Sequence, residues 1–235
     1  MEENTSIIIE GVKIMEPIAG LTNLVISASG IFIFLQLTGR QPFSFLRKQK
    51  WPYFFLFMGA SSFLGALTHS CRFYTDDTTF YVLWLTMQVI IGAGVSFAQL
   101  GTNEYVFSDT KNKRIFNTIV WIQLLLFIII AISMKRFVIV IIHSAVGLLS
   151  VFFINLFSFK KEPLAVAWIS AGIFVTTITA LVHGTKFSMG KWFSYKDLSH
   201  LLIVVSLFFM FVGVKRINKT YQKKRLGRIN IILLQ

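Results

Sequence analysis

The four histidines of this chain, His69, His143, His183 and His200, all fall toward the same end of long apolar segments. Imidazole binds metals and exchanges protons near neutral pH, so a shared depth makes these residues candidates for one site. Asp197 lies three residues before His200, which puts a carboxylate and an imidazole on one face of a helix. This spacing suits a shared metal or a hydrogen-bonded pair.

The Asp197 carboxylate needs a partner if it faces the interior of a membrane, because an unpaired charge there is costly. His200 and His69 are the nearest candidates for this partner, and His183 comes next. In the competing interpretation, histidines near a membrane surface simply meet lipid headgroups and water. The sequence leaves both interpretations open.

Other polar residues fall near the same level. His143 has only Ser144 as a polar neighbour within one helical turn, so we expect it to pack or hydrogen-bond between helices. A hydrated vestibule would explain a further set, which comprises Glu16, Asn23, Asp76, Asp77 and Lys196. For the two aspartates of this set, an ordinary outer surface is the favoured interpretation.

Seven apolar segments must position these side chains. Hydrophobic residues make up 55% of the 235 residues and the mean hydropathy is +0.70, which is typical of a membrane protein. Backbone groups in hydrocarbon must be hydrogen-bonded within their segment, and the sequence lacks the alternating polarity of barrel strands. We therefore predict an all-α polytopic membrane protein, a seven-helix transmembrane bundle with spans at residues 17–38, 52–72, 79–100, 115–133, 137–158, 163–183 and 197–214.

The distribution of basic residues predicts the orientation of the bundle. Most of the 23 Lys and Arg residues lie in one set of connections and in the C-terminal tail, while the other set carries most of the acidic residues. Basic loops stay cytoplasmic, so the N-terminus is predicted outside and the C-terminus cytoplasmic. The predicted parts are an extracytoplasmic arm (1–16), the seven-helix domain (17–214) and a basic amphipathic cytoplasmic tail (215–235).

The net charge of +13 suggests a partner. The basic residues are spread over loops and a tail beside a membrane, with no soluble domain to present them to nucleic acid. Membrane lipids, with anionic headgroups at the tail, are therefore the expected partners, and nucleic acid is not. We expect an integral protein of a prokaryotic inner membrane.

Three short motifs carry a resemblance to known proteins. They are Glu16-Pro17 followed by Asn23, the stretch from Gly65 to Ser70 with the sequence GALTHS, and Asp197-Leu198-Ser199-His200. These motifs resemble an uncharacterised prokaryotic seven-helix family. More remotely, the layout is similar to the CREST superfamily, which includes alkaline ceramidases and the adiponectin/progestin-type receptors.

The CREST resemblance implies an intramembrane zinc ion that activates water against a lipid amide. Bound zinc lowers the pKa of water to about 7 and polarises a carbonyl. Carried over by position, His69 is the early ligand and His200 the later one. The chain departs from the superfamily at Lys196, which replaces a further histidine, and at Gly65, which replaces a serine.

The sequence offers candidate replacements for the missing histidine and the missing serine. Asp197, with His183, would complete a zinc site together with the two matching histidines, because carboxylates are ordinary zinc ligands. The serine has candidate replacements in Ser61, Ser62 and Ser199. Asp197 has a second interpretation, as a residue that orients His200.

Two functional hypotheses follow. The first is a zinc-dependent hydrolase of a lipid-like amide or ester near the outer leaflet, with metal ligands His69, His183, Asp197 and His200 and catalytic roles for Asp197 and Ser199. The second is a receptor, sensor or small-solute carrier that uses the same polar pocket without chemistry. The inner halves of the spans carry almost no ionisable residue, which counts against an ion pump. Haem held by paired histidines is a third interpretation.

Overall fold

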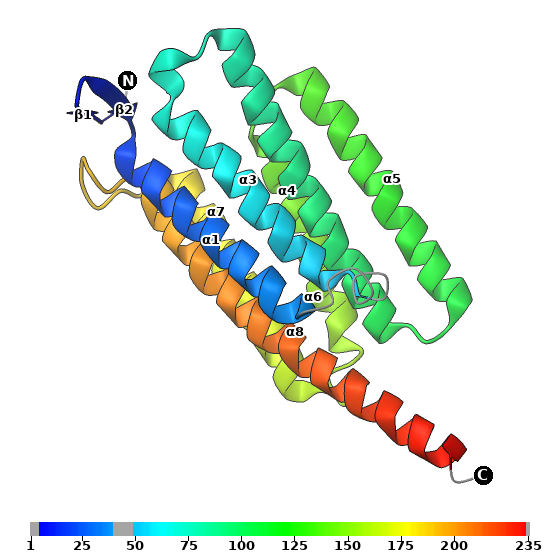
Figure 1. Cartoon of the computed structure of the whole chain (residues 1–235). Coiled ribbons are helices and arrows are strands. Elements are labelled where there is room, and N and C mark those ends of the chain that lie inside the picture. The colour runs from blue at the N-terminus through cyan, green and yellow to red at the C-terminus, as the bar shows by residue number, and fades with distance from the viewer. Residues whose placement is uncertain (1–4, 40–48, 234–235) are drawn as a thin grey trace.

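The chain is a bundle of seven helices in the part that the structure, a computed structural model, describes: residues 5–39 and 49–233, with side chains as far as residue 220. The helices are α1 (Pro17–Thr38), α3 (Trp51–Ser70), α4 (Asp77–Val106), α5 (Thr110–Met134), α6 (Val138–Leu156), α7 (Pro163–Thr185) and α8 (Tyr195–Leu233). They run alternately up and down (Figure 1), so the predicted all-α bundle is confirmed. The sidedness of the bundle in a membrane stays a prediction.

Six of the seven helices are long and apolar enough to cross a membrane; among the described helices of the bundle, α3 is the exception. α3 carries Ser61, Ser62 and His69 among its apolar residues, and it packs between α1 and α4. Its neighbours shield this polarity from lipid. The chain is thus an integral membrane protein with a more polar helix inside its bundle.

The helices form a ring with one helix outside it. Each helix of the ring packs on the next, in the order α1, α3, α4, α6, α7 and α8, and α8 packs on α1. α5 packs mainly on α4 and α6 at the edge of the bundle (Figure 1). Small residues allow close packing in the ring. A Cβ atom on Gly30 would lie 2.6 Å from the carbonyl oxygen of Phe55, so α1 and α3 approach as closely as their backbones permit.

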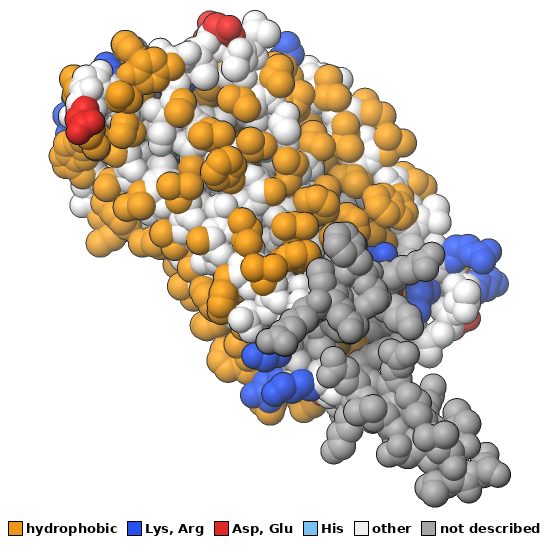
Figure 2. All heavy atoms as spheres, viewed as in Figure 1, with side chains coloured by type: hydrophobic (Ala, Val, Ile, Leu, Met, Phe, Trp, Pro, Cys, Tyr) orange, Lys and Arg blue, Asp and Glu red, His pale blue; other side chains and the backbone are white. Residues whose placement is uncertain are grey.

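Apolar side chains fill the ring toward the end from which α8 projects, which we call the tail end. Phe55, Ile169, Leu207 and Met210 are buried there in one cluster with Ile33 of α1. The surface is apolar along the middle of the bundle, with mainly basic side chains at the tail end and both charge signs at the opposite end (Figure 2). This distribution is that of a protein embedded in lipid.

A short β-hairpin caps the opposite end, which we call the hairpin end. Strands β1 (Ser6–Ile9) and β2 (Val12–Met15) pair antiparallel, with Ser6 opposite Met15, and the turn between them uses positive φ angles at Glu10 and Gly11. The sequence interpretation gave this segment only as an exposed arm. A two-residue turn between β-branched runs is a hairpin signal, and here it is carried by Glu10 and Gly11.

Several helices extend beyond the predicted spans. α4 begins two residues earlier and ends six residues later than expected, and Asp76 caps its first turn by accepting a 2.6 Å hydrogen bond from the Thr79 amide. The predicted tail continues α8 without a break to Leu233 (Figure 1). Hydropathy marks the apolar part of a helix, whereas capping and backbone hydrogen bonds set its true ends.

Candidate functional site

A cavity of about 440 Å³ lies inside the ring at the hairpin end, and we call it the bundle cavity. Its polar lining residues are Glu16, Asn23, Ser61, Ser62, Thr68, His69, Arg72, His183, Lys196 and His200. Its apolar lining includes Ile26, Met58, Met87, Ile91, Phe137 and Ile203. Ile203 lies seven residues, or about 10 Å of helix, beyond Lys196 toward the tail end. The charged lining residues therefore lie at the hairpin end, and the deeper lining is mainly apolar, with the hydroxyls of Ser61 and Ser62 as its polar groups.

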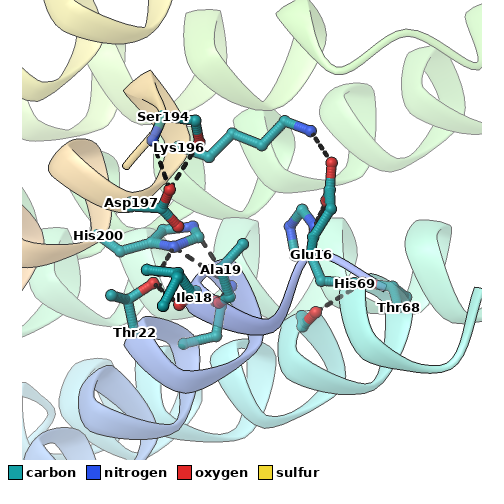
Figure 3. Close-up of polar contacts among 12 residues, drawn as sticks. Glu16, Ile18, Ala19, Thr22, Thr68, His69, Ser194, Lys196, Asp197 and His200 are labelled. Atoms are coloured by element: carbon teal, nitrogen blue, oxygen red, sulfur yellow. Dashed lines mark hydrogen bonds and ion pairs between the residues drawn. The ribbon is translucent and has the colours of Figure 1, made fainter. Parts of the chain in front are cut away.

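Glu16 joins three helices at the charged end. Its carboxylate accepts a hydrogen bond from Nδ1 of His69 on α3 and pairs with Nζ of Lys196 on α8 at 2.5 Å (Figure 3). Its own backbone immediately precedes α1 and adopts the left-handed conformation with φ 42° and ψ 55°. A non-glycine residue in this conformation is strained, and such strain often marks a functional position.

The hairpin holds Glu16 in place. The Glu16 amide donates to the carbonyl oxygen of Thr5 at 2.8 Å, and Pro17 follows as the first residue of α1. Burial raises the pKa of Glu16, but hydrogen bonds from His69 and Lys196 outweigh that effect and lower it to about 2. The carboxylate is therefore charged at any ordinary pH.

His200 lies deeper on α8 and is held by α1. Its Nδ1 lies 2.9 Å from Oγ1 of Thr22, whose hydroxyl donates to the carbonyl oxygen of Ile18 at 2.9 Å. The imidazole thus contacts α1 through Nδ1, while its second nitrogen, Nε2, has a different neighbour. Asn23 Nδ2 lies 3.3 Å from that Nε2. The His200 and His69 rings are adjacent, with centroids 6.0 Å apart.

Asp197 does not join this group. Its Oδ2 accepts hydrogen bonds from the amide of Ser194 at 2.6 Å and from its hydroxyl at 2.8 Å (Figure 3). Asp197, the third residue of α8, thus reaches back to the residue that precedes the helix, and Ser194 donates both hydrogen bonds. Asp197 is buried, and the partner expected in His200 or His69 is instead Ser194.

The remaining predicted residues are dispersed around the site. His183 lines the bundle cavity. The centroid of its ring lies 5.0 Å from that of Tyr195 and 5.5 Å from that of Phe137. Ser199 is buried with a hydroxyl that has no partner among the described residues, and it does not line the cavity. Ser61 and Ser62 do line it.

The zinc prediction depends on three ligands meeting at one point. The described part of the chain holds no group of three His, Cys, Asp or Glu side chains placed to bind a metal ion. His69 uses Nδ1 on Glu16, and Asp197 is engaged at the start of α8. These side chains, as they are arranged, do not fit a zinc ion. The zinc site therefore stays a prediction.

The vestibule residues of the sequence interpretation divide into two kinds. Glu16, Asn23 and Lys196 line the bundle cavity, whereas Asp76 and Asp77 lie on the surface at the start of α4. Asp77 pairs with the guanidinium of Arg72 at 2.6 Å, and that guanidinium also lies over the Phe80 ring. The sequence did not predict Thr22 or Arg72 as site residues. Only the fold brings Thr22 beside His200 and Arg72 into the cavity lining.

A second polar cluster lies between α4, α5 and α6, and we call it the amide seam. Its members are Gln99, Asn103, Asn117, Gln123, His143 and Ser150. His143 is buried, with Nε2 3.1 Å from the Gly92 carbonyl oxygen and its ring stacked on Phe127 at 4.3 Å. The expectation that His143 packs and hydrogen-bonds between helices is confirmed.

Comparison with known proteins places the chain at the level of a family. A search of curated proteins finds no match, and neither does a search of solved structures. The matching family model covers most of the chain, from the start of α1 to the projecting part of α8. This model describes a family of unknown function, DUF6962, and it matches residues 18–219. The chain therefore belongs to the DUF6962 family.

Proposed function

We propose that this protein is a seven-helix receptor or sensor that binds an amphiphilic molecule in the bundle cavity. One observation carries the proposal: a cavity of about 440 Å³ inside the ring is charged at one end and mainly apolar at the other. Its volume falls in the range of about 300–1,000 Å³ that small-molecule sites occupy. The ligand's head would lie near Glu16 and Lys196, and its chain near Met58 and Ile203.

The lining favours a head that accepts hydrogen bonds, such as a carboxylate or an amide carbonyl. The lining holds Lys196 and Arg72 against the single carboxylate of Glu16, although Arg72 also pairs with Asp77 outside the cavity. The Asn23 amide and Lys196 add hydrogen-bond donors beside the two adjacent imidazoles. An anionic or carbonyl head would therefore gain more from this lining than an ammonium head.

The packing below the cavity favours a receptor over a carrier. Phe55, Leu207 and Met210 are almost fully buried in the apolar core that fills the ring toward the tail end. A carrier needs a polar route to each side in turn, and such routes are lined by polar groups. The cavity lies on one side of this core only.

Hydrolysis of a lipid-like amide or ester is the second candidate, and one observation favours it. Glu16 accepts from Nδ1 of His69, which is how a carboxylate orients an imidazole that acts as a base, and the His200 ring lies 6.0 Å away. The zinc that the CREST resemblance implies belongs to this candidate, but the side-chain arrangement does not support it.

The test uses a fluorescent acyl probe, dansyl-undecanoate, with detergent-purified protein. We expect saturable binding that unlabelled decanoate displaces and decane does not. Lys196→Met should weaken binding about tenfold or more, because it removes the partner of the anionic head. Lys111→Met, at an exposed lysine of the tail end, is the matched control and should change binding less than about twofold. Non-saturable binding, or equal binding by both variants, would overturn the proposal.

A further inference from the structure

A second cavity, of about 410 Å³, opens at the hairpin end, and we call it the mouth cavity. Its lining comes from the segment before β1, the connection between α7 and α8, and the starts of α1 and α8. It includes Thr5, Ser188, Lys191, Ser194 and Asp197. This lining is more polar than that of the bundle cavity, as expected for a space in contact with water.

Two residues line both cavities, namely Glu16 and Lys196. Their side chains are bonded to each other at 2.5 Å, and they are only 16% and 23% exposed. The ion pair therefore stands where the two cavities adjoin. A molecule that passes from one cavity to the other must separate or displace this pair.

Glu16 is the fixed half of the pair. Its backbone is held by the hydrogen bond to Thr5 and by Pro17, and its carboxylate keeps a second partner, His69, if Lys196 leaves. Loss of Lys196 thus does not leave the buried carboxylate without a hydrogen-bond partner, which is a large part of the cost of breaking such pairs.

Lys196 is the half that can move. It is the second residue of α8, where the helix begins, and its flexible four-carbon side chain borders both cavities. Its ammonium group can reach toward the mouth cavity without any movement of the backbone. An anion that arrives there competes with Glu16 for the same ammonium group.

We propose that the Glu16–Lys196 pair is a gate, and that a water-soluble amphiphile with an anionic head reaches the bundle cavity through the mouth cavity. The ligand draws Lys196 away from Glu16, and its chain then follows into the apolar part of the bundle cavity. The gate rests on the proposed function, because it assumes that the bundle cavity binds a ligand. The competing route is lateral, from the lipid between two helices of the ring.

The test measures access to the bundle cavity without using any ligand. In a Cys71→Ser background, which removes the single cysteine, Ser62→Cys places a thiol in the bundle-cavity lining. Two membrane-impermeant methanethiosulfonates, one anionic and one cationic, are added in water, and labelling rates are compared with and without Lys196→Met. We expect both reagents to label about tenfold faster when the pair is broken. Lys196→Arg keeps the pair and should keep labelling slow.

Controls separate the gate from its alternatives. Thr5→Cys places a thiol in the mouth cavity and should label at the same rate in both backgrounds, because no gate precedes it. Opposite changes for the two reagents at Ser62→Cys would mean an electrostatic effect alone and would overturn the gate. Slow labelling by both polar reagents in every background, with rapid labelling by a lipid-soluble maleimide, would establish the lateral route instead. Both results would leave the probe-binding test of the proposed function untouched.

Discussion

The bundle cavity and the amide seam both bury polar side chains between helices, yet they differ in charge and in space. The bundle cavity gathers Glu16 and Lys196 around a volume of about 440 Å³. In the seam, neutral amides bond to one another directly, as Gln99 does with Gln123 at 3.1 Å. Buried polarity alone is therefore no sign of a ligand site, whereas charge that borders an open volume is.

The seam has a structural role that the cavity lacks. α5 packs outside the ring and exposes large apolar side chains to the surroundings. Lipid provides little hydrophobic drive for one helix to pack on another, so interhelical hydrogen bonds and close van der Waals packing must hold α5 in place. Asn103 donates to Asn117 at 3.1 Å, and Phe127 packs on His143.

The two histidines at similar depth make the contrast clear. His143 uses its ring to pack against Phe127 and to bond the Gly92 carbonyl. His200 lines the bundle cavity, and its Nδ1 lies 2.9 Å from the Thr22 hydroxyl oxygen. The same side chain thus supports the fold in one region and faces a candidate ligand in the other.

The largest loss of stability should come from His143→Ala. Loss of the stacked ring and its hydrogen bond should destabilise the fold by about 2 kcal/mol, which is at the low end for large-to-small core changes. Thermal unfolding in detergent measures this loss, and probe binding at a temperature where the variant is folded should be unchanged. Weakened binding by the folded variant would break the distinction between the two regions.

His200→Ala should show the reverse pattern. We expect about tenfold weaker binding of the dansyl-undecanoate probe, because the variant removes a polar group of the cavity lining. The unfolding temperature should fall less than in His143→Ala, since the Thr22 hydroxyl is still engaged with backbone carbonyls. An unchanged probe affinity in this variant would remove His200 from the site.

Asn117→Leu tests the seam through a single hydrogen bond. It removes the acceptor of the Asn103 amide and should cost about 1 kcal/mol, in line with interhelical hydrogen bonds in membranes. Ile122→Ala, on the exposed side of α5, is the same-helix control and should cost less. If the control variant proved the less stable of the two, the seam would not be what holds α5.

Acid should weaken the cavity region before the seam. The pKa of Glu16 falls from its ordinary value of 4.5 to about 2 in the fold, so its stabilising effect is complete above pH 4.5. It is lost as the pH falls toward 2, because the carboxylate gains a proton and loses Lys196. The unfolding temperature of wild type should therefore drop over this window, and that of Glu16→Gln should drop less. Equal drops would assign the acid sensitivity to other groups.

The smallest expected effect is on the zinc content of the purified protein. Elemental analysis of protein prepared without chelator should find no stoichiometric zinc in wild type, His69→Ala or His200→Ala, because the arranged side chains lack a three-ligand set. One zinc per chain in wild type, lost in both variants, would instead support the hydrolase candidate. It would also show that the site rearranges when metal binds.

Much of the fold was predictable because hydropathy reports the environment of each segment directly. Residues 17–38 and α1 agree at both ends, and the remaining spans agree in place and order. The prediction was least accurate where polar residues extend a helix, as at Asn103 to Val106 in α4. These residues leave the apolar segment while their backbone hydrogen bonds continue.

The candidate site was only partly predictable. Depth along each segment put all four histidines at one level, and three of them, His69, His183 and His200, line one cavity, whereas His143 lies in the amide seam. Asp197 bonds through Oδ2 to Ser194, which lies only three residues away, while its Oδ1 is buried with no hydrogen-bond partner among the described residues. Its spacing from His200 was real, but spacing does not say which neighbour a side chain prefers.

The sequence alone determined that this chain is a helical membrane bundle, since only helices satisfy the backbone within such apolar segments. It also determined that polar and ionisable groups concentrate at one level of that bundle. The tertiary structure decided which of them meet. Glu16 and His69 are 53 residues apart in the chain, and His69 and Lys196 are 127 apart, so no local pattern encodes their contact. Ring closure by α1 and α8 brings the ion pair together beside the two cavities that it lines.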